Sequence, residues 1–509
     1  MTAAPPELPA LRERMAELSD LYGIGGLLSW DQQTMMPPGG AAGRADQLAT
    51  LARVIHAREA DSGLGELLRV LESWADGEDP DSDDVRLVAW VRRDFEKAVR
   101  VPLDLAAELE RAKALGHQAW LEARAANDFS RFRDALARHI ELRHRYVECF
   151  EGHEHPYDVL LDDFEPGLTT AELRPLLARL RDALVPLVAA AGDARQRSND
   201  GAFLGSFPVA AQRIAALDVL EGVGFDPDSW RLDTALHPFA AGITHTDVRL
   251  TTRYDEHDFA PALYSVLHEF GHGLYEAGVA PELYRTTLDD PVSLGVHESQ
   301  SRLWENQVGR SRPFCAWLLP RLRESLPGLG ETDADTLYRA VNTVQPSLVR
   351  TDADETTYNL HIVLRFELEL GLVDGSLAVD DLPAAWDAGM ERLLGIQVPG
   401  PEQGVLQDVH WSAGLMGYFP TYTVGNLMAA QLWERLAADL GDVDGQIERG
   451  EFAPLREWLR EHVHRHGRKF PPRELLRRVT GDDLRVEPFV DYLGGKLADA
   501  GVIAAPANG

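Results

Sequence analysis

The chain has 509 residues, 45% of them hydrophobic and 26% charged, and no stretch approaches the roughly 20 consecutive apolar residues of a membrane-spanning helix. A formal net charge of −32 repels nucleic acids and anionic membranes, so we expect neither as a partner. The N-terminus lacks a signal-peptide pattern, and the two cysteines, Cys149 and Cys315, indicate no disulfide framework. We therefore expect a cytoplasmic protein.

Most of the chain shows the apolar spacing that is typical of amphipathic helices. Four segments are the clearest predicted helices. The first begins with the apolar period Leu11, Met15, Leu18 and Tyr22, and two others cover residues 103–127 and 427–440. The fourth runs from a capping box at 169–172 to Val188. Acidic or Pro/Gly-rich joints lie at residues 76–84, 192–201, 326–335 and 395–404. None resembles a long flexible linker, so we predict one mainly helical domain over residues 1–509, with frayed ends at about 1–6 and 501–509.

The segment from His237 to Tyr254 departs from this helical pattern. β-Branched residues and partial alternation from Asp247 to Tyr254 predict a strand of a small sheet. If it lies at the edge of the sheet, such a strand can bind an extended peptide. The other interpretation is a short structural hairpin.

Residues 268–272 read His-Glu-Phe-Gly-His, which matches the metal-binding pattern HExxH. On a helix, His268 and His272 lie one above the other and can bind one zinc ion. Glu269 lies close enough to accept a proton from a water molecule on that metal. Asp258 and Pro261 mark the helix start. The helix is expected to be buried because apolar residues recur on it at Leu263, Leu267, Phe270 and Leu274.

A catalytic zinc ion usually has three protein ligands. Tyr275 and Gly278 stand where the longer motif HExxHxxGxxH needs Gly and His, which excludes that arrangement. Glu298, on a second predicted helix, is a better candidate for the third ligand than Glu276, one turn beyond the motif. Glu298 also has an ordinary explanation as the partner of Arg302 one turn later.

Four further segments combine residue types that seldom meet for structural reasons alone, at residues 237–239, 349–354, 404–411 and 417–422. Taken singly, each has a structural explanation: a helix start, a salt bridge, a buried histidine or an aromatic patch in the core.

Together with HExxH, these segments resemble the carboxypeptidase Taq family of zinc metallocarboxypeptidases. The family's motifs HPF, DxRxT, HExxH, HES, IRxxAD and GxxQDxHW occur in that order, at residues 237–239, 247–251, 268–272, 297–299, 349–354 and 404–411. The only departure is Val349 in place of Ile, which changes no reactive group.

The resemblance implies a mainly helical, zincin-like peptidase fold with a long substrate groove, usually as a homodimer; the predicted strand adds a small β-sheet near the metal site. It also implies removal of single amino acids from the C-terminus of peptides, with broad side-chain tolerance. By motif match, His268, His272 and Glu298 bind zinc, for which cobalt can substitute, and Glu269 is the general base.

Side-chain chemistry suggests further roles. His410 and Tyr422 can each donate a hydrogen bond to the oxyanion that develops at the scissile carbonyl. The guanidinium of Arg350 can bind the terminal carboxylate of a peptide bidentately, unless a salt bridge to Asp352 or Asp354 occupies it.

His237 and Arg249 are expected to bind the substrate or to support the metal-binding helix. Two other functions stay open: a zinc oligopeptidase that cuts inside short peptides, and a catalytically silent peptide-binding protein. The intact Glu269 argues against the silent protein, because such a protein has no use for a general base.

Overall fold

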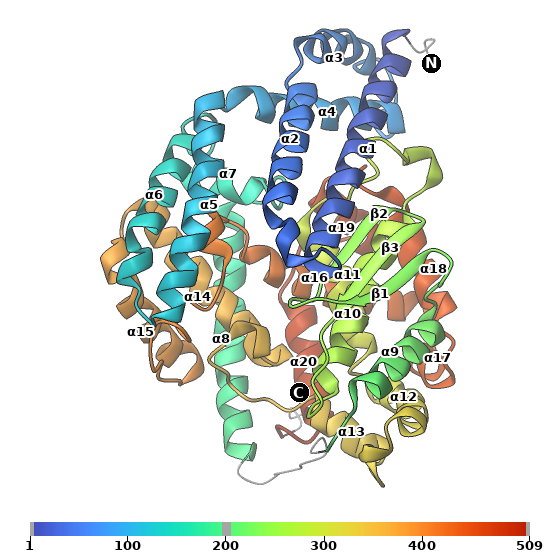
Figure 1. Ribbon diagram of the computed structural model, residues 1–509. Coiled ribbons are helices and arrows are strands. Elements are labelled where there is room, and N and C mark those ends of the chain that lie inside the picture. Colours follow the sequence, from blue (N-terminus) through green and yellow to red (C-terminus); the bar gives the residue numbers. More distant parts are fainter. Residues whose placement is uncertain (1–4, 196–204, 505–509) are drawn as a thin grey trace. The chain divides into compact units, whose positions relative to one another are not determined.

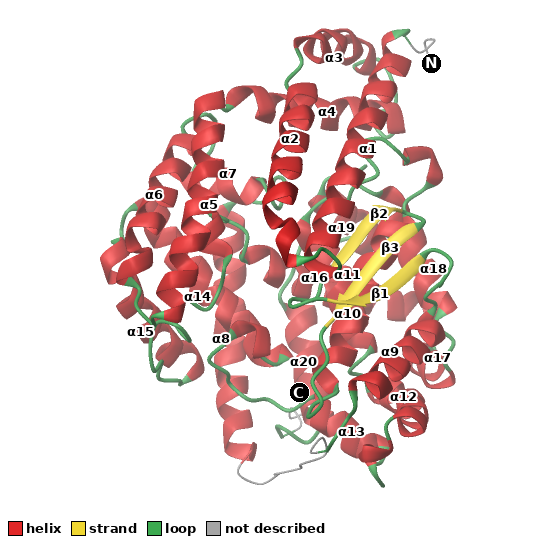
Figure 2. Ribbon diagram, in the orientation of Figure 1, coloured by secondary structure: helices red, strands yellow, loops and turns green. Residues whose placement is uncertain are grey.

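The computed structural model describes residues 5–195 and 205–504. These residues form a mainly helical protein with one three-stranded sheet, which confirms the predicted fold class (Figures 1 and 2). The chain folds into two compact units. Unit 1 comprises Met1–Val99, Gly201–Tyr338 and Leu432–Gly481, and unit 2 comprises Arg100–Asp200, Arg339–Gln431 and Asp482–Gly509. The single domain predicted for residues 1–509 stays a prediction, and its frayed ends and the joint at 192–201 lie partly outside the described residues.

Unit 1 contains the sheet. Its strands are β1 (Trp230–Thr234), β2 (Ala240–Thr244) and β3 (Asp247–Thr252). Its helices are α1 (Glu7–Thr34), α2 (Ala41–Glu59), α3 (Ser62–Ala75), α4 (Asp83–Arg100), α9 (Val209–Val223), α10 (Ala260–Gly278), α11 (Leu294–Arg302), α12 (Arg312–Ser325), α17 (Val443–Arg449), α18 (Ala453–His462) and α19 (Pro472–Thr480). The predicted joints at 76–84 and 326–335 lie mostly between helices, but each includes the first two residues of the helix that follows, α4 or α13 (Ala334–Val341).

Strand β3 is the central strand of the sheet, parallel to β1 and antiparallel to β2. The predicted strand is therefore confirmed, but it cannot add a peptide strand because both of its edges are paired. Strand β3 packs on α10 (Figure 1). Its residues Val248 and Leu250 are buried. The hydroxyl of Thr252 donates to the carbonyl oxygen of Ala262 in α10 at 3.1 Å, which ties the sheet to the helix that carries HExxH.

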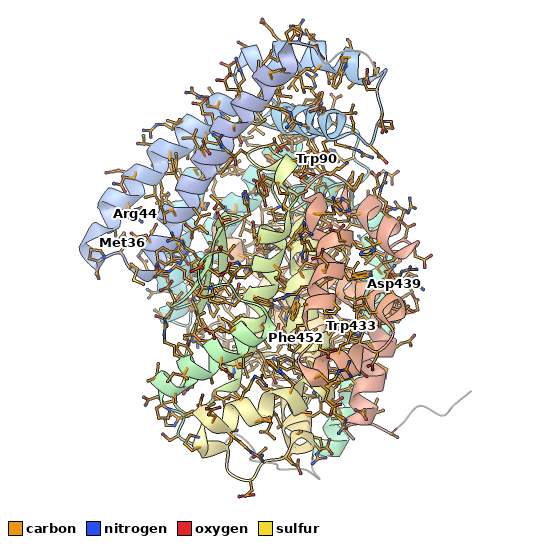
Figure 3. All side chains as sticks on the ribbon, turned by 90° about the vertical axis from the view of Figure 1, so that its right-hand side faces the viewer. Met36, Arg44, Trp90, Trp433, Asp439 and Phe452 are labelled. Carbon is orange, nitrogen blue, oxygen red and sulfur yellow. The ribbon has the colours of Figure 1, made fainter. Side chains whose placement is uncertain are left out.

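An aromatic cluster fills the core of unit 1. Phe452, labelled in Figure 3, lies just before α18 and is 2% exposed. Its ring centroid is 4.9 Å from that of Trp317 and 5.9 Å from that of Phe314. Burial of such large side chains supplies much of the free energy that holds the helices together.

Unit 2 is helical. Its helices are α5 (Leu103–Ala125), α6 (Ser130–Val147), α7 (Pro156–Asp162), α8 (Thr170–Arg195), α14 (Glu355–Asp374), α15 (Leu382–Leu394) and α20 (Glu487–Asp499). Two further helices, α13 (Ala334–Val341) and α16 (Pro420–Leu440), belong partly to each unit.

The helices predicted at the N-terminus and at 103–127 are confirmed as α1 and α5. The predicted capping box is present, because Thr169 and Glu172 each accept a hydrogen bond from the other's backbone N–H, at 3.3 and 3.2 Å. The helix predicted at 427–440 begins earlier, at Pro420, so Tyr422 lies in the first turn of α16. Within the described ranges, no helix combines the length and apolar composition needed to cross a membrane.

Candidate active site

Helix α10 carries the HExxH residues and begins at Ala260, with Phe259 rather than the predicted Asp258 as its N-cap residue. The carboxylate of Asp258 accepts a hydrogen bond from the backbone N–H of Ala260 at 3.0 Å, and Pro261 lies in the first turn. The rings of His268 and His272 project from the same face, with centroids 4.8 Å apart. The helix thus holds both imidazoles at the spacing that one metal ion requires.

Helix α11 approaches α10 closely at Gly271. A Cβ atom at this position would lie 2.4 Å from the carbonyl oxygen of Gln300, so no larger residue fits without movement. The hydroxyl of Ser293 caps α11 by accepting from the N–H of Val296 at 3.0 Å. The tight contact brings Glu298, in the middle of α11, to the two histidines.

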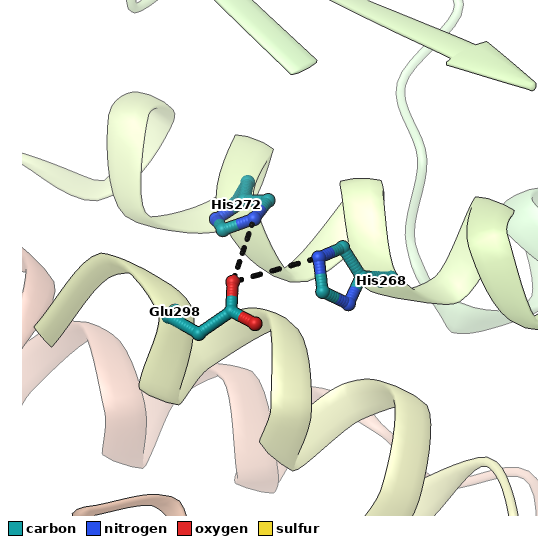
Figure 4. A group of neighbouring side chains, drawn as sticks. All are labelled: His268, His272 and Glu298. Atoms are coloured by element: carbon teal, nitrogen blue, oxygen red, sulfur yellow. Dashed lines mark ion pairs between the residues drawn. The ribbon is translucent and has the colours of Figure 1, made fainter. Parts of the chain in front are cut away.

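The carboxylate of Glu298 faces both imidazoles (Figure 4). Its Oε2 atom lies 3.6 Å from Nε2 of His268 and 3.5 Å from Nε2 of His272. Among the described residues, His268, His272 and Glu298 are the one group of three possible metal ligands whose ligand atoms all lie within 4.8 Å of one another. Two imidazole nitrogens and one carboxylate oxygen suit zinc and similar divalent ions. The other explanation of Glu298 also holds, because Nε of Arg302 donates to its Oε1 at 2.6 Å.

Glu305 is a further site residue that sequence reasoning missed. It lies in the π-helical turn Leu303–Val308 that continues α11, and its Oε2 is 2.9 Å from Nδ1 of His268. Arg302 and Arg310 also donate to its carboxylate, at 3.2 and 3.1 Å. The sequence offered one signal for it: Glu305 follows Glu298 by seven residues, or two helical turns, which places both on one helix face.

Burial adjusts the protonation of these groups. Burial raises the pKa of Glu269, which is 5% exposed, to about 7. Burial lowers the pKa of His272 well below its usual range, which favours the neutral imidazole that binds a metal. At His268 burial acts in the same direction, but the carboxylates of Glu298 and Glu305 raise its pKa overall.

The motif residues of strand β3, Arg249 and Thr251, both make structural contacts. Arg249 donates through Nε and Nη2 to Asp247, at 2.8 and 2.9 Å, and its guanidinium lies 4.3 Å from the ring centroid of Trp30 in α1. The hydroxyl of Thr251 accepts from the N–H of Phe239 at 2.8 Å and donates to its carbonyl oxygen at 2.9 Å. Thr251 thereby fixes the loop in which His237 is exposed.

Arg350 lies in unit 2 and is 6% exposed. Its salt-bridge partner is Asp408 at 2.8 Å, not Asp352 or Asp354. Asp354 instead caps α14, because its Oδ1 accepts from the N–H of Thr356 at 2.9 Å. Sequence reasoning missed Asp408 as the partner, although both residues stand in the motifs quoted above.

His410 and Tyr422 lie beside Arg350 in unit 2. Nε2 of His410 is 3.3 Å from the hydroxyl oxygen of Tyr422, and the Arg350 guanidinium lies 4.9 Å from the Tyr422 ring centroid. Burial lowers the pKa of His410 to about 4, so its imidazole is neutral at pH 7. The structure thus brings these three predicted residues together.

Known proteins resemble this chain over almost its whole length. The family model of the carboxypeptidase Taq (M32) metallopeptidases matches residues 10–497. Thermostable carboxypeptidase 1 of Thermus thermophilus is 42% identical over 497 residues, which cover 96% of this chain and 98% of that protein. Carboxypeptidase 1 of Bacillus subtilis is 37% identical, with coverage of 93% and 94%. The crystal structure of an M32 carboxypeptidase from Deinococcus radiodurans has a TM-score of 0.93 at 42% identity, covering 97% of this chain and 99% of that one.

Proposed function

Because the chain belongs to the carboxypeptidase Taq (M32) metallopeptidase family, and is therefore a metal-dependent carboxypeptidase, we propose that it binds zinc through His268, His272 and Glu298. Its substrates are peptides. Of the functions predicted from the sequence, the carboxypeptidase is confirmed, in preference to the oligopeptidase and the silent peptide-binding protein.

The clustering of three ligand atoms within 4.8 Å of one another is the observation that carries the proposal of a metal site. Imidazole and carboxylate ligands favour zinc, and cobalt accepts the same ligands and geometry. A zinc ion bound there would supply a water molecule of lowered pKa and a positive charge for the scissile carbonyl.

Glu269 is the proposed general base. It is next to a ligand on α10 and 95% buried, so its carboxylate sits in a site of low dielectric constant. It accepts the proton of the attacking water and then delivers it to the amine of the leaving amino acid.

The proposed anchor of the substrate is Arg350, whose guanidinium binds the free terminal carboxylate. His410 and Tyr422, which lie beside Arg350, are the proposed donors to the oxyanion. His237 is proposed to bind substrate because its side chain is exposed. The contacts of Arg249 with Asp247 and Trp30 favour a supporting role in the sheet.

Three further proposals rest on the family resemblance and on composition. They are broad tolerance of C-terminal side chains along a long groove, a homodimer in solution, and a cytoplasmic location. Cys149 and Cys315, neither of them in a disulfide, agree with a reducing compartment. Light scattering on the purified protein tests the dimer directly.

The test of the activity is to incubate the zinc-loaded protein with an N-blocked peptide and to follow its mass with time. We expect stepwise loss of single residues from the C-terminus. Glu269→Gln should slow this loss by roughly 10²–10⁴-fold while the zinc content stays near one ion per chain. Internal fragments, or full activity of this variant, would contradict the proposal.

The metal is tested separately. Removal of the metal by a chelator should abolish activity, and zinc or cobalt should restore it. His272→Ala should lose zinc, because it removes one of three ligands. If that variant retains zinc with unchanged affinity, the proposed site is wrong.

A further inference from the structure

One face of α14 carries four buried polar residues at steps of three, four and four. They are Tyr358, His361, Arg365 and Glu369. Tyr358 accepts a hydrogen bond from Nη1 of Arg350 at 2.8 Å, and Arg365 and Glu369 bind the segment 407–417. The helix therefore supports both Arg350 and the segment that contains His410, and all these residues belong to unit 2.

Arg350 and Arg365 share one carboxylate. Nη2 of Arg350 donates to Oδ1 of Asp408 at 2.8 Å, and Nε of Arg365 donates to Oδ2 at 2.7 Å, an oxygen that Nε of Arg350 contacts only at 3.3 Å. The Arg350 side chain is 7% exposed, that of Arg365 is 0% exposed and that of Asp408 is 12% exposed. Two buried guanidinium groups thus face a single negative charge.

The groups around this cluster do not balance the second positive charge. Burial lowers the pKa of His361 to about 3 and that of His410 to about 4, so both rings are neutral at pH 7. Burial raises the pKa of Glu369, the next carboxylate on the helix, to about 7, and its oxygens accept from Trp411 at 2.7 Å and from Tyr157 at 2.6 Å, so at pH 7 it carries only part of a negative charge. A buried, unbalanced charge is costly to the folded state, which suggests that a ligand supplies the missing negative charge.

Arg350 is the member of the pair that can reach a ligand. Its hydrogen bonds to Asp408 and Tyr358 use three of its five N–H groups, one on each nitrogen. Arg365 is enclosed: it also donates to Gln407 Oε1 at 2.8 Å and to the carbonyl oxygen of His361 at 2.8 Å.

We propose that Arg365 is a positioning residue which holds one oxygen of Asp408, and so leaves Arg350 with positive charge for the terminal carboxylate of a peptide. This inference rests on the proposed role of Arg350. Without Arg365, the whole charge of Asp408 faces Arg350 alone, and the pair becomes neutral. The site then keeps its hydrogen-bond donors but loses its attraction for an anion.

The test compares Arg365→Met with Arg365→Lys. The lysine keeps the positive charge but lacks the planar guanidinium group and its fixed N–H donors. With an N-blocked peptide that has a free carboxylate, we expect Arg365→Met to raise KM about ten-fold or more, with kcat within about three-fold. Arg365→Lys should keep KM within about three-fold of the wild type. Arg392→Gln, which removes a positive charge from a half-exposed pair with Glu367, should leave KM unchanged.

A second arm uses the matching peptide with a C-terminal amide. This amide carries no negative charge, so the positive charge of Arg350 cannot attract it. Its slow cleavage should change equally little in Arg365→Met and Arg365→Lys. If both variants lower kcat for both peptides, Arg365 only pins the segment 407–417 and the inference is overturned. If Arg365→Met does not fold, Arg365→Lys decides, because a ten-fold rise in its KM contradicts a role through charge.

Arg350→Gln separates the two claims. If it leaves KM for the carboxylate peptide unchanged, the proposed anchor is wrong and the inference falls with it. If it raises KM while Arg365→Met does not, the anchor stands and only the role of Arg365 is wrong.

Discussion

The Oε2 atom of Glu305 lies 2.9 Å from Nδ1 of His268, on the side of the ring opposite to the nitrogen that faces Glu298. A carboxylate that accepts a hydrogen bond from Nδ1 fixes the tautomer in which Nε2 carries a free lone pair for the metal. Since Glu305 is held in turn by Arg302 and Arg310, these contacts fix the orientation of His268 as a proposed ligand.

We expect Glu305→Gln to lower the affinity for zinc by about 10–100-fold, because the amide is a weaker acceptor and can also turn its NH₂ group to the ring. Competition between the protein and a chromophoric chelator measures this affinity without any assay of activity. Glu474→Gln is the matched control, since Glu474 is likewise bound by two arginines, Arg86 at 2.8 Å and Arg478 at 2.7 Å, and not by an imidazole. Equal losses in the two variants would contradict a specific role for Glu305.

A second prediction concerns the close approach of α10 and α11. Gly271→Ala places a Cβ atom 2.4 Å from the carbonyl oxygen of Gln300 and 2.6 Å from Cα of Ser301, both of them backbone atoms. We expect a loss of stability of about 1–3 kcal/mol, and weaker zinc binding because Glu298 moves away from the histidines. Thermal unfolding and zinc titration measure the two effects.

The control for this variant is Gly494→Ala in α20, where a new Cβ atom would meet nothing within 4 Å. This change should stabilise the protein slightly, by about 0.5–1 kcal/mol, because alanine is the better helix former. If Gly271→Ala behaves like Gly494→Ala, the contact between the two helices is looser than the structure shows.

A third prediction concerns the loop before β2. Thr251→Val removes the hydroxyl that binds both backbone groups of Phe239, at 2.8 and 2.9 Å, while keeping the shape of the side chain. We expect unfolding by urea to show a loss of about 1–3 kcal/mol. Thr246→Val, at an exposed position in the same region, should stay within about 0.5 kcal/mol of the wild type. An equal effect of the two changes would show that the hydroxyl of Thr251 is not what holds the loop.

The sequence predicted those parts of the site that local spacing determines. The positions of His268 and His272 on one helix face depend only on helix geometry, and the hydrogen bond from Ala260, the first residue of α10, to Asp258 depends only on local capping. The pairing of Arg350 with Asp408, the contact of Arg249 with Trp30 and the parallel pairing of β1 with β3 could not be predicted. They join residues far apart in the chain, and only the tertiary fold decides which of many similar side chains meet.

The same distinction applies to the predicted strand. Alternation from Asp247 identified a strand but not its neighbours, so its central place in the sheet was missed. An alternating pattern reports that one face is buried, whereas pairing at the two edges leaves no trace in the order of side chains.

A last prediction uses Glu369, a fully buried carboxyl group whose pKa burial raises from 4.5 to about 7. The unfolded chain releases this proton near pH 4.5, and the folded protein keeps it until about pH 7. Stability should therefore fall as the pH rises through this window, by at most about 3 kcal/mol from this group. Glu369→Gln cannot titrate, so its free energy of unfolding should change less between pH 4.5 and pH 7.

Urea unfolding at several pH values measures the free energy of unfolding of this variant and of the wild type. The contributions of the other titrating groups cancel in the difference between the two. Glu367→Gln, on the same helix but 33% exposed and paired with Arg181 and Arg392, is the control and should keep the slope of the wild type. The amide of Glu369→Gln still offers one acceptor to Trp411 or Tyr157, so the segment 407–417 should stay in place. A slope equal to that of the wild type would mean that Glu369 is already ionised at pH 5, with its three hydrogen-bond donors outweighing the cost of burial.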